Sequence, residues 1–521
     1  MGITALDCFS RKNISDPRNV AIAIIKRPAT VSTTDPRFRG TLISNPGGPG
    51  QSGTQMVLRA GRFIQQLVDG EDHKYELVSF DPRGVWQSTP SLDCFEGKDF
   101  ARGPWKWEKR IMGNLDGSSQ AAIQAHLAAA RACGGFCKSS KHDFAEHVST
   151  AAVARDMLEI VDRVESERKE QNTHRDQELL SADSVAKIQY LGFSYGTHLG
   201  NTFASLFPDK VKRMILDGVV DSYAFTGTRW PRGFLQDAEK VVDHFYNTCF
   251  EAKESCALYK LGYASPDDIR NSIQLIFNMM KEAPLYLTPC YSPVIFFPLV
   301  AEDLDQLSRG QYTDIVNNNP ELVGPAALRN APCDDAIGGS DPVKYWDYAA
   351  METGFSVICG DRVDVRNTTA EELARYIQQM VAESPSIGSL WATFYAQCAG
   401  WPYRARWAFH GPFRTPPPGT ETGPNAPLLF LSSEFDPVTP LAAAISMAEH
   451  HPNSLVVKQH SYGHTALFAA PSNSTREILR EYMHHGKLPE PDWRSPGGAG
   501  IAECDADCSN PWLGCPKYRS V

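Results

Sequence analysis

The stretch AKIQYLGFSYGTHLGNTFASLF, residues 186–207, decides the fold: a short apolar run leads into Gly-Phe-Ser-Tyr-Gly and then into a helical pattern that stops at Pro208. The pattern predicts a buried strand, a sharp turn that carries Ser194, and a helix. A serine hydroxyl becomes a useful nucleophile when it is held exposed beside a base, with amide donors facing the developing oxyanion. The same residues also fit an ordinary glycine-assisted turn, so the rest of the chain must distinguish the two interpretations.

Length and charge limit the classes of protein that the chain can represent. It has 521 residues, of which 42% are hydrophobic, and a formal net charge of −10. This length allows one large domain with an insertion, or two to three ordinary domains. The negative charge offers no basic surface for nucleic acid, which disfavours nucleic-acid-binding proteins. The sequence has no apolar run of about 18 residues, so we expect no membrane span.

Thirteen cysteines, several of them closely spaced, indicate either disulfides or a metal site. The closely spaced ones are Cys133 with Cys137, Cys249 with Cys256, and Cys504, Cys508 and Cys515. A zinc site would need a second Cys/His pair at short, regular spacing, which the sequence does not offer. We therefore expect disulfides, an oxidising compartment, and neither a metal nor a cofactor. The odd count leaves at least one thiol free or paired between chains.

Other features bear on export from the cell. Sequons begin at Asn13, Asn367 and Asn473 and are compatible with secretion. The chain begins MGITALDCF, without the basic and apolar regions of a leader peptide. We expect a secreted or secretory-pathway protein whose leader is missing from this sequence, with an intracellular location as the alternative.

Before the central turn, the sequence predicts strands at 19–25 and 40–44, the second running into Asn-Pro-Gly-Gly-Pro-Gly at 45–50. Such a loop supplies backbone freedom, and its functional interpretation is half of an oxyanion hole that uses the amide of Gly48 opposite that of Tyr195. The alternative is an ordinary Pro/Gly turn.

Three further segments precede the serine turn. Residues 75–84, YELVSFDPRG, predict a buried strand and a turn in which Asp81 and Arg83 form a stabilising pair. A helix is expected from Thr150, with one apolar face made by Val153, Met157, Ile160, Val161 and Val164. The polar segment 165–184 is expected to be an exposed, mobile loop.

After the turn, VKRMILDGVVD repeats the strand pattern and ends with Asp217 and Asp221. Alternating strands and helices predict an α/β fold with a mostly parallel sheet. From 223 to 400 the chain becomes rich in aromatic residues and helical patterns, which indicates a mainly helical lid inserted into the sheet domain. We therefore divide the chain into a first core part at 1–222, a lid at 223–400, and a second core part at 401–521 with a cysteine-containing tail.

Two polar residues stand at the ends of late strands. Asp436 follows the strand in residues 427–440, and His464 follows the strand in residues 454–467. Functional groups of open α/β sheets lie beyond the carboxyl ends of the strands, so Ser194, Asp436 and His464 should meet in one crevice. The chain order Ser, Asp, His is that of the α/β-hydrolases.

This order predicts a role for each residue. His464 would take the proton of Ser194 and later deliver it to the leaving group, and Asp436 would fix the imidazole tautomer. Each has a simpler interpretation, because Asp436 could be only a turn cap and histidines near loops are common. Asp217, also at a strand end, is the rival acid.

The sequence also resembles a known family, the tripeptidyl-aminopeptidase-like α/β-hydrolases, which are relatives of the proline iminopeptidases. The matching stretches are NPGGPGQSG, FDPRG, TAAVARDM, GFSYGTHLG, FPDKVKRMILDGVVD, CAGWP, FDPVTP and SYGH. The resemblance implies Ser194 as nucleophile, Asp436 as acid, His464 as base, and an oxyanion hole at Gly48 and Tyr195. The family usually has Gly-x-Gly-x-Ser where this chain has GVWQS at 84–88, so Trp86 is a departure near the sheet edge.

We therefore expect a serine hydrolase that releases short peptides or amino acids from free N-termini through an acyl-enzyme. Holding the substrate ammonium would need a carboxylate, and candidates in the lid are Glu302, Asp303, Asp334 and Asp335. The alternative is an ester, lactone or thioester hydrolase, or an acyl-transferring cyclase, because an aromatic lid suits apolar substrates equally well. A third, non-catalytic alternative is a binding protein on a hydrolase scaffold.

Overall fold

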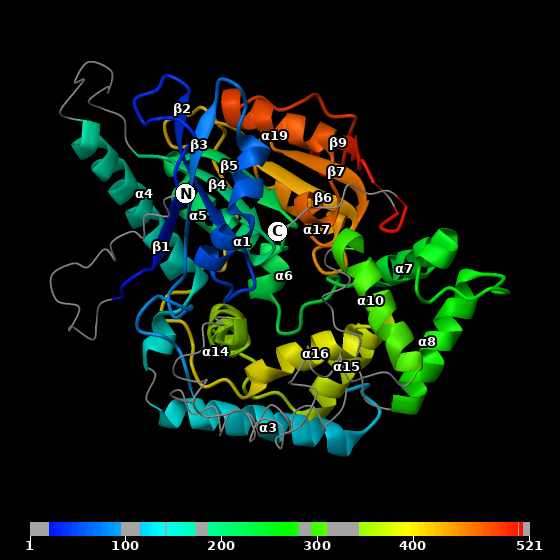
Figure 1. The fold of residues 1–521 in the computed structure, drawn as a ribbon. Coiled ribbons are helices and arrows are strands. Elements are labelled where there is room, and N and C mark those ends of the chain that lie inside the picture. Colours follow the sequence, from blue (N-terminus) through cyan, green and yellow to red (C-terminus); the bar gives the residue numbers. More distant parts are fainter. Residues whose placement is uncertain are drawn as a thin grey trace, which may run out of the picture.

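A computed structural model of the chain describes residues 20–94, 115–140, 143–172, 186–280, 293–309, 343–508 and 510–513. Its centre is a nine-stranded sheet in the order β1-β3-β2-β4-β5-β6-β7-β9-β8 (Figure 1). The strands are β1 (Ile24–Arg27), β2 (Phe38–Asn45), β3 (Lys74–Phe80), β4 (Ile188–Phe193), β5 (Val211–Asp217), β6 (Leu429–Phe435), β7 (Leu455–Tyr462), β8 (Trp493–Arg494) and β9 (Gly500–Asp505). Edge strands β1 and β8 pair antiparallel and all other pairs are parallel, which confirms the predicted mostly parallel α/β fold.

The central strands form where the sequence is apolar enough to be buried on both faces. Every residue of β4 is buried, and its neighbours alternate between the two sides of the sheet: Tyr190 packs in one apolar cluster and Leu191 in the other. This alternation follows from the two-residue period of a strand. The expected strand at 19–25 begins later, at Ile24, with an isolated bridge at Ala21 before it.

Helices cover both faces of the sheet (Figure 1). One face carries α1 (Gly53–Val68) and α19 (Asn473–His485), whose apolar residues share a cluster with the sheet. The other face carries α4 (Thr150–Asn172), α5 (Tyr195–Leu206) and α17 (Leu441–Ala448). The helices on the two faces bury β4, the strand that leads into the serine turn, from both sides.

Helix α4 confirms one prediction and corrects another. Its predicted apolar face packs against the sheet: Val153, Met157, Ile160 and Val161 are buried, and Val164 is partly buried against the same cluster. The expectation of a loop over 165–184 is wrong for residues 165–172, which continue the helix. An i,i+3 pair of Arg168 with Glu165, and a contact of Arg168 with Glu76 of β3 at 2.8 Å, stabilise this end of the helix. Residues 173–184 lie outside the described part of the chain.

Between β5 and β6 the described chain is mainly helical, as predicted. The helices are α6 (Ser222–Gly227), α7 (Ala238–Ala252), α8 (Pro266–Met280), α10 (Pro293–Ser308), α14 (Val343–Asp361), α15 (Ala370–Glu383) and α16 (Gly388–Ala396). Five of these helices form two groups: α7, α8 and α10 share one apolar cluster, and α15 and α16 pack with α3 (Gln120–Ser139) (Figure 1). Helix α3 comes from the segment before the serine turn, so the second group draws on two separate parts of the chain.

Disulfides confirm the preferred interpretation of the cysteines. Between cysteines that the structure describes, the pairs are Cys94–Cys137, Cys249–Cys256 and Cys359–Cys398. Cys508 is also disulfide-bonded. Cys137 therefore pairs with a cysteine 43 positions away rather than with its close neighbour Cys133. Within the described ranges, no helix combines the length and apolar character needed to cross a bilayer.

Candidate active site

The serine turn has the predicted form. Strand β4 ends at Phe193, helix α5 begins at Tyr195, and Ser194 between them has φ 54° and ψ −125°, a backbone conformation rarely adopted by residues with side chains. The turn needs its glycines, because a Cβ on Gly192 would lie 2.5 Å from the main-chain oxygen of Gly196. The strained turn therefore presents Ser194 at the carboxyl edge of the sheet, at the start of a helix.

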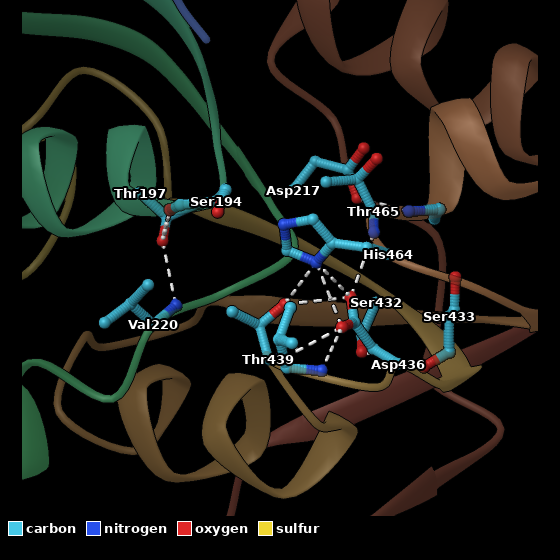
Figure 2. A network of polar contacts seen from close by, with 12 residues as sticks. Ser194, Thr197, Asp217, Val220, Ser432, Ser433, Asp436, Thr439, His464 and Thr465 are labelled. Carbon is cyan, nitrogen blue, oxygen red and sulfur yellow. Dashed lines mark hydrogen bonds and ion pairs between the residues drawn. The ribbon is translucent and has the colours of Figure 1, made fainter. Parts of the chain in front are cut away.

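His464 and Asp436 lie together at the same edge of the sheet. Nδ1 of His464 is 3.0 Å from both carboxylate oxygens of Asp436. Figure 2 shows the opposite edge of the imidazole turned toward Ser194, with the carboxylate on the far side of the ring. The structure thus brings the three residues together in the order serine, imidazole, carboxylate.

The carboxylate of Asp436 is fully buried and held by several donors. Main-chain amides of Val438, Thr439 and Thr465 donate to it over distances of 2.8 to 3.0 Å. The hydroxyl of Thr439 donates to Oδ2 at 2.8 Å and lies 3.0 Å from Nδ1 of His464 (Figure 2). Sequence reasoning missed Thr439, although its position three residues after Asp436 in the Asp-Pro turn is typical of a capping partner.

The carboxylate of Asp217, the alternative acid, has different hydrogen-bond partners. Its carboxylate accepts the amides of Ala466 at 2.7 Å and Leu467 at 3.1 Å, in the first turn of α18 (Ala466–Ala469). Its burial raises the pKa of the carboxyl to about 7. Asp217 is therefore directed to the segment that follows His464, whereas Asp436 is directed to the imidazole ring.

The Pro/Gly loop after β2 lies against the serine turn. A Cβ on Gly47, which has φ 103°, would come within 2.9 Å of Cβ of Ser194 and 3.0 Å of the amide nitrogen of Tyr195. A Cβ on Gly48 would instead meet the following amides of its own loop. The amides of this loop and of Tyr195 are thus within one small region beside Ser194, where amide donors can face an oxyanion.

Helix α14 packs on the outside of this region. The hydroxyl of Thr353 donates to the main-chain oxygen of Gly84 at 2.8 Å, and a Cβ on Gly354 would lie 2.9 Å from the main-chain oxygen of Pro49. Glu352, the preceding residue, is 5% exposed. Glu352 therefore stands one residue before the contact with Gly84 and two residues before the contact with Pro49, and the sequence analysis did not predict a role for it.

The other expected carboxylates lie elsewhere. Glu302 and Asp303 are exposed residues of α10, and Asp334 and Asp335 lie outside the described residues. Asp237 is a further candidate that the sequence did not mark. The charges of Asp436 and Glu434 contribute to raising its pKa, after the larger effect of burial, and it lies 2.8 Å from Nζ of Lys240.

Asp81 and Arg83 do not form the expected turn pair. Asp81 accepts from the hydroxyls of Ser52 and Thr54 at 2.5 and 3.0 Å and so anchors the start of α1. Arg83 instead forms a bidentate pair with Asp156 of α4, at 2.5 and 2.7 Å. The two residues therefore connect the DPRG turn to two different helices.

Trp86, the departure from the family pattern, is partly buried with φ 44°.

Comparison with known proteins places this site in a family context. The model described as "alpha/beta hydrolase fold" matches residues 177–267, and the model described as "TAP-like protein" matches residues 384–495. The first match contains Ser194, and the second contains Asp436 and His464. The fold and these matches define the chain as an α/β-hydrolase. Within that class, its resemblance to the tripeptidyl-aminopeptidase-like proteins is confirmed.

Curated relatives have peptidase and esterase names. Serine protease Hip1 of Mycobacterium tuberculosis is 34% identical over 39% of this chain, and the matched region spans about a third of that protein's length (33%). Tripeptidyl aminopeptidase of Streptomyces lividans is 25% identical over 86% of this chain and 75% of its own. Carboxylesterase B of Mycobacterium tuberculosis is 34% identical over 26% of this chain and 24% of its own. Among solved structures, the α/β-hydrolase MGS-M2 from a deep-sea metagenome library covers 90% of this chain and 96% of its own, at 12% identity and a TM-score of 0.34.

Proposed function

We propose that the chain is a serine hydrolase in which Ser194, His464 and Asp436 act as nucleophile, base and orienting acid. The observation that carries the proposal is the 3.0 Å contact of Nδ1 of His464 with both oxygens of Asp436, with the other edge of the ring turned toward Ser194 (Figure 2). An Nδ1–H donor to a buried carboxylate leaves Nε2 as the proton acceptor, which a general base requires.

The reaction follows from this arrangement in two steps. Nε2 of His464 takes the hydroxyl proton of Ser194 as its Oγ attacks the substrate carbonyl, and the imidazolium passes that proton to the leaving group. Water then attacks the acyl-enzyme, with His464 again as base. Asp436 stabilises the imidazolium in both steps. The amides of Gly48 and Tyr195 are our proposed donors to the oxyanion.

The substrate class that we propose is a short peptide with a free N-terminus. Two observations support it: a relative that aligns over 86% of this chain is named tripeptidyl aminopeptidase, and Hip1 is named a serine protease. Glu352 is a buried carboxylate of α14 and precedes Thr353, which contacts the loop at Gly84; we propose it as the partner of a substrate ammonium. Ester hydrolysis is the second candidate. The observation that favours it is the similarity to carboxylesterase B, which is 34% identical over 26% of this chain.

A labelling experiment and a substrate panel test these proposals separately. A fluorophosphonate should label the wild-type protein and fail to label Ser194→Ala, and equal labelling of both proteins would refute the nucleophile. Aminoacyl and tripeptidyl anilides should be cleaved faster than aryl esters, and acetylation of the substrate amine should abolish cleavage. An enzyme that is labelled at Ser194 but prefers esters would retain the mechanism and refute the peptidase assignment.

A further inference from the structure

Three histidines converge at the edge of the sheet opposite Ser194. His73 precedes β3 in the turn after α1, and His484 and His485 are the last residues of α19. One ligand nitrogen from each lies within 4.8 Å of the others. Because β3 and β4 run in the same direction as β2, the start of β3 is at the amino edge of the sheet, whereas Ser194 follows the carboxyl end of β4.

The hydrogen bonding of His484 favours metal binding through one defined atom. Its Nε2 donates to the main-chain oxygen of Val68 at 2.8 Å, which fixes the proton on Nε2 and leaves the lone pair on Nδ1. Metal-bound histidines usually donate their second ring nitrogen to a carbonyl or carboxylate in this way. Gly70 packs closely against this ring, because a Cβ added to Gly70 would lie 2.6 Å from Cε1 of His484. This packing holds the ring in place.

The charged groups around the cluster are of both signs. Asp72 acts on His73 and Glu481 on His484, while Arg39 and Arg480 oppose them. Glu481 also lies 4.0 Å from Nε2 of His485, within reach of a fourth ligand position.

Ring geometry shows what must move on binding. His485 lies nearly perpendicular to His73 and His484, with centroids 5.3 and 6.0 Å away, as expected for imidazoles around one ion. His73 and His484 are instead stacked, 4.0 Å apart with an interplanar angle of 8°. Tetrahedral zinc with bonds of about 2.0–2.1 Å needs ligand nitrogens about 3.3 Å apart, so the partly exposed ring of His73 must tilt out of the stack.

We propose that His73, His484 and His485 form a site for a divalent transition-metal ion such as Zn²⁺, which joins the α1–β3 turn to the end of α19. Sequence patterns did not predict this site, because His73 is separated from the other two ligands by most of the chain. The ion is far from the proposed nucleophile, so its role is structural: binding to the native state alone stabilises that state. The inference does not depend on the proposed catalytic function.

Calorimetric titration of the EDTA-treated full chain with Zn²⁺ tests the site. We expect about one equivalent to bind, with at least a tenfold loss of affinity in His485→Gln and in His73→Gln. His147→Gln is the matched control, because His147 is exposed on another element and should leave affinity unchanged. Zn²⁺ should raise the Tm of the wild type and of His147→Gln but not that of His485→Gln.

A second measurement separates a lost ligand from a misfolded protein. His485 is exposed, so His485→Gln should keep the wild-type Tm in EDTA. Co²⁺ in place of Zn²⁺ should give the intense visible bands of a tetrahedral ion in the wild type and lose them in His73→Gln. Absence of binding to the wild type, or full affinity in either ligand variant, would overturn the proposal.

Discussion

The main-chain oxygen of Asp217 accepts the amide hydrogen of Ser194 at 2.9 Å, while the carboxylate of the same residue accepts the amides that begin α18. Asp217 thus ties the serine turn to the segment that follows His464. The next residue, Gly218, lies against His464 itself, because a Cβ added to Gly218 would be 3.3 Å from Cε1 of the imidazole. A strand-end aspartate can therefore organise an active site without being the acid that orients the base.

The first prediction distinguishes the two aspartates by activity. Asp436→Asn should lower kcat by about 10⁴-fold, because an amide opposite Nδ1 favours the wrong imidazole tautomer. Asp217→Asn replaces an acceptor of two amide hydrogens and should cost less, through a displaced His464. The measurement is kcat on the best anilide or ester for both variants. Equal losses, or a larger loss in Asp217→Asn, would make Asp217 the acid.

The second prediction concerns the pH dependence of stability. Burial raises the pKa of Asp217 from 3.8 to about 7. At a pH between these two values, the carboxyl is protonated in the native state and ionised in the unfolded chain. The free energy of unfolding should therefore fall as pH rises between about 4 and 7, and Asp217→Asn should show a shallower fall. Asp361, whose pKa burial also raises to about 7, contributes the same slope in both proteins.

Urea unfolding of the wild type and Asp217→Asn at several pH values measures this slope. The asparagine also introduces a pH-independent loss, because its NH₂ group faces an amide donor, so the comparison must use slopes rather than absolute stabilities. Parallel lines for the two proteins would show that Asp217 is ionised throughout this range.

A third prediction tests the contact between the Pro/Gly loop and the serine. Gly47→Ala should reduce fluorophosphonate labelling, because the new Cβ would come within 2.9 Å of Cβ of Ser194 and would force a residue with a side chain into φ 103°. Gly419→Ala is the matched control: it has φ 77°, but a Cβ there meets nothing within 4 Å. Both variants carry backbone strain of about 1–3 kcal/mol, so labelling that falls equally in both would point to strain alone.

The fold was predictable because its signals are local and repeated. Apolar runs such as that of β4, and a turn that only glycines permit around Ser194, determine strand, turn and helix within one short stretch. Two late apolar runs likewise predicted strands that end just before Asp436 and His464, and the structure brings these two residues into contact. Each of these steps uses neighbours in sequence.

The parts that sequence reasoning missed depend on partners far along the chain. Arg83 contacts Asp156, 73 positions along the chain, rather than Asp81. The contacts of Thr353 with Gly84 and of Gly354 with Pro49 likewise join α14 to two loops from the first part of the chain. Local patterns carry no information about such contacts.

The fourth prediction concerns the disulfide Cys359–Cys398, which joins α14 to the turn after α16 and closes 39 positions of sequence. Replacing both cysteines by serine should lower the free energy of unfolding by about 2–4 kcal/mol. Peptide mapping without reductant should recover this pair together with Cys94–Cys137 and Cys249–Cys256. Free thiols at all six positions in protein taken from its native source would contradict an oxidising compartment.

The fifth prediction asks which carboxylate holds a substrate ammonium. Glu352→Gln should raise KM for substrates with a free N-terminus by roughly 10- to 100-fold, the range expected for loss of a charged hydrogen bond of about 1.5–3 kcal/mol, with a smaller change in kcat. Asp237→Asn is the matched comparison, because Asp237 is another buried carboxylate of the chain between β5 and β6, and it lies 2.8 Å from Nζ of Lys240.

N-acetylated substrates provide the internal control for this assignment, because they carry no ammonium for Glu352 to bind. A variant that only loosens the packing of α14 would slow free and acetylated substrates alike, whereas loss of an ammonium partner penalises only the free ones. If Asp237→Asn raises KM for free N-termini and Glu352→Gln does not, the binding carboxylate lies at the start of α7. An unchanged KM in both variants would leave the peptidase proposal without an ammonium-binding residue among these two and favour the ester hydrolase.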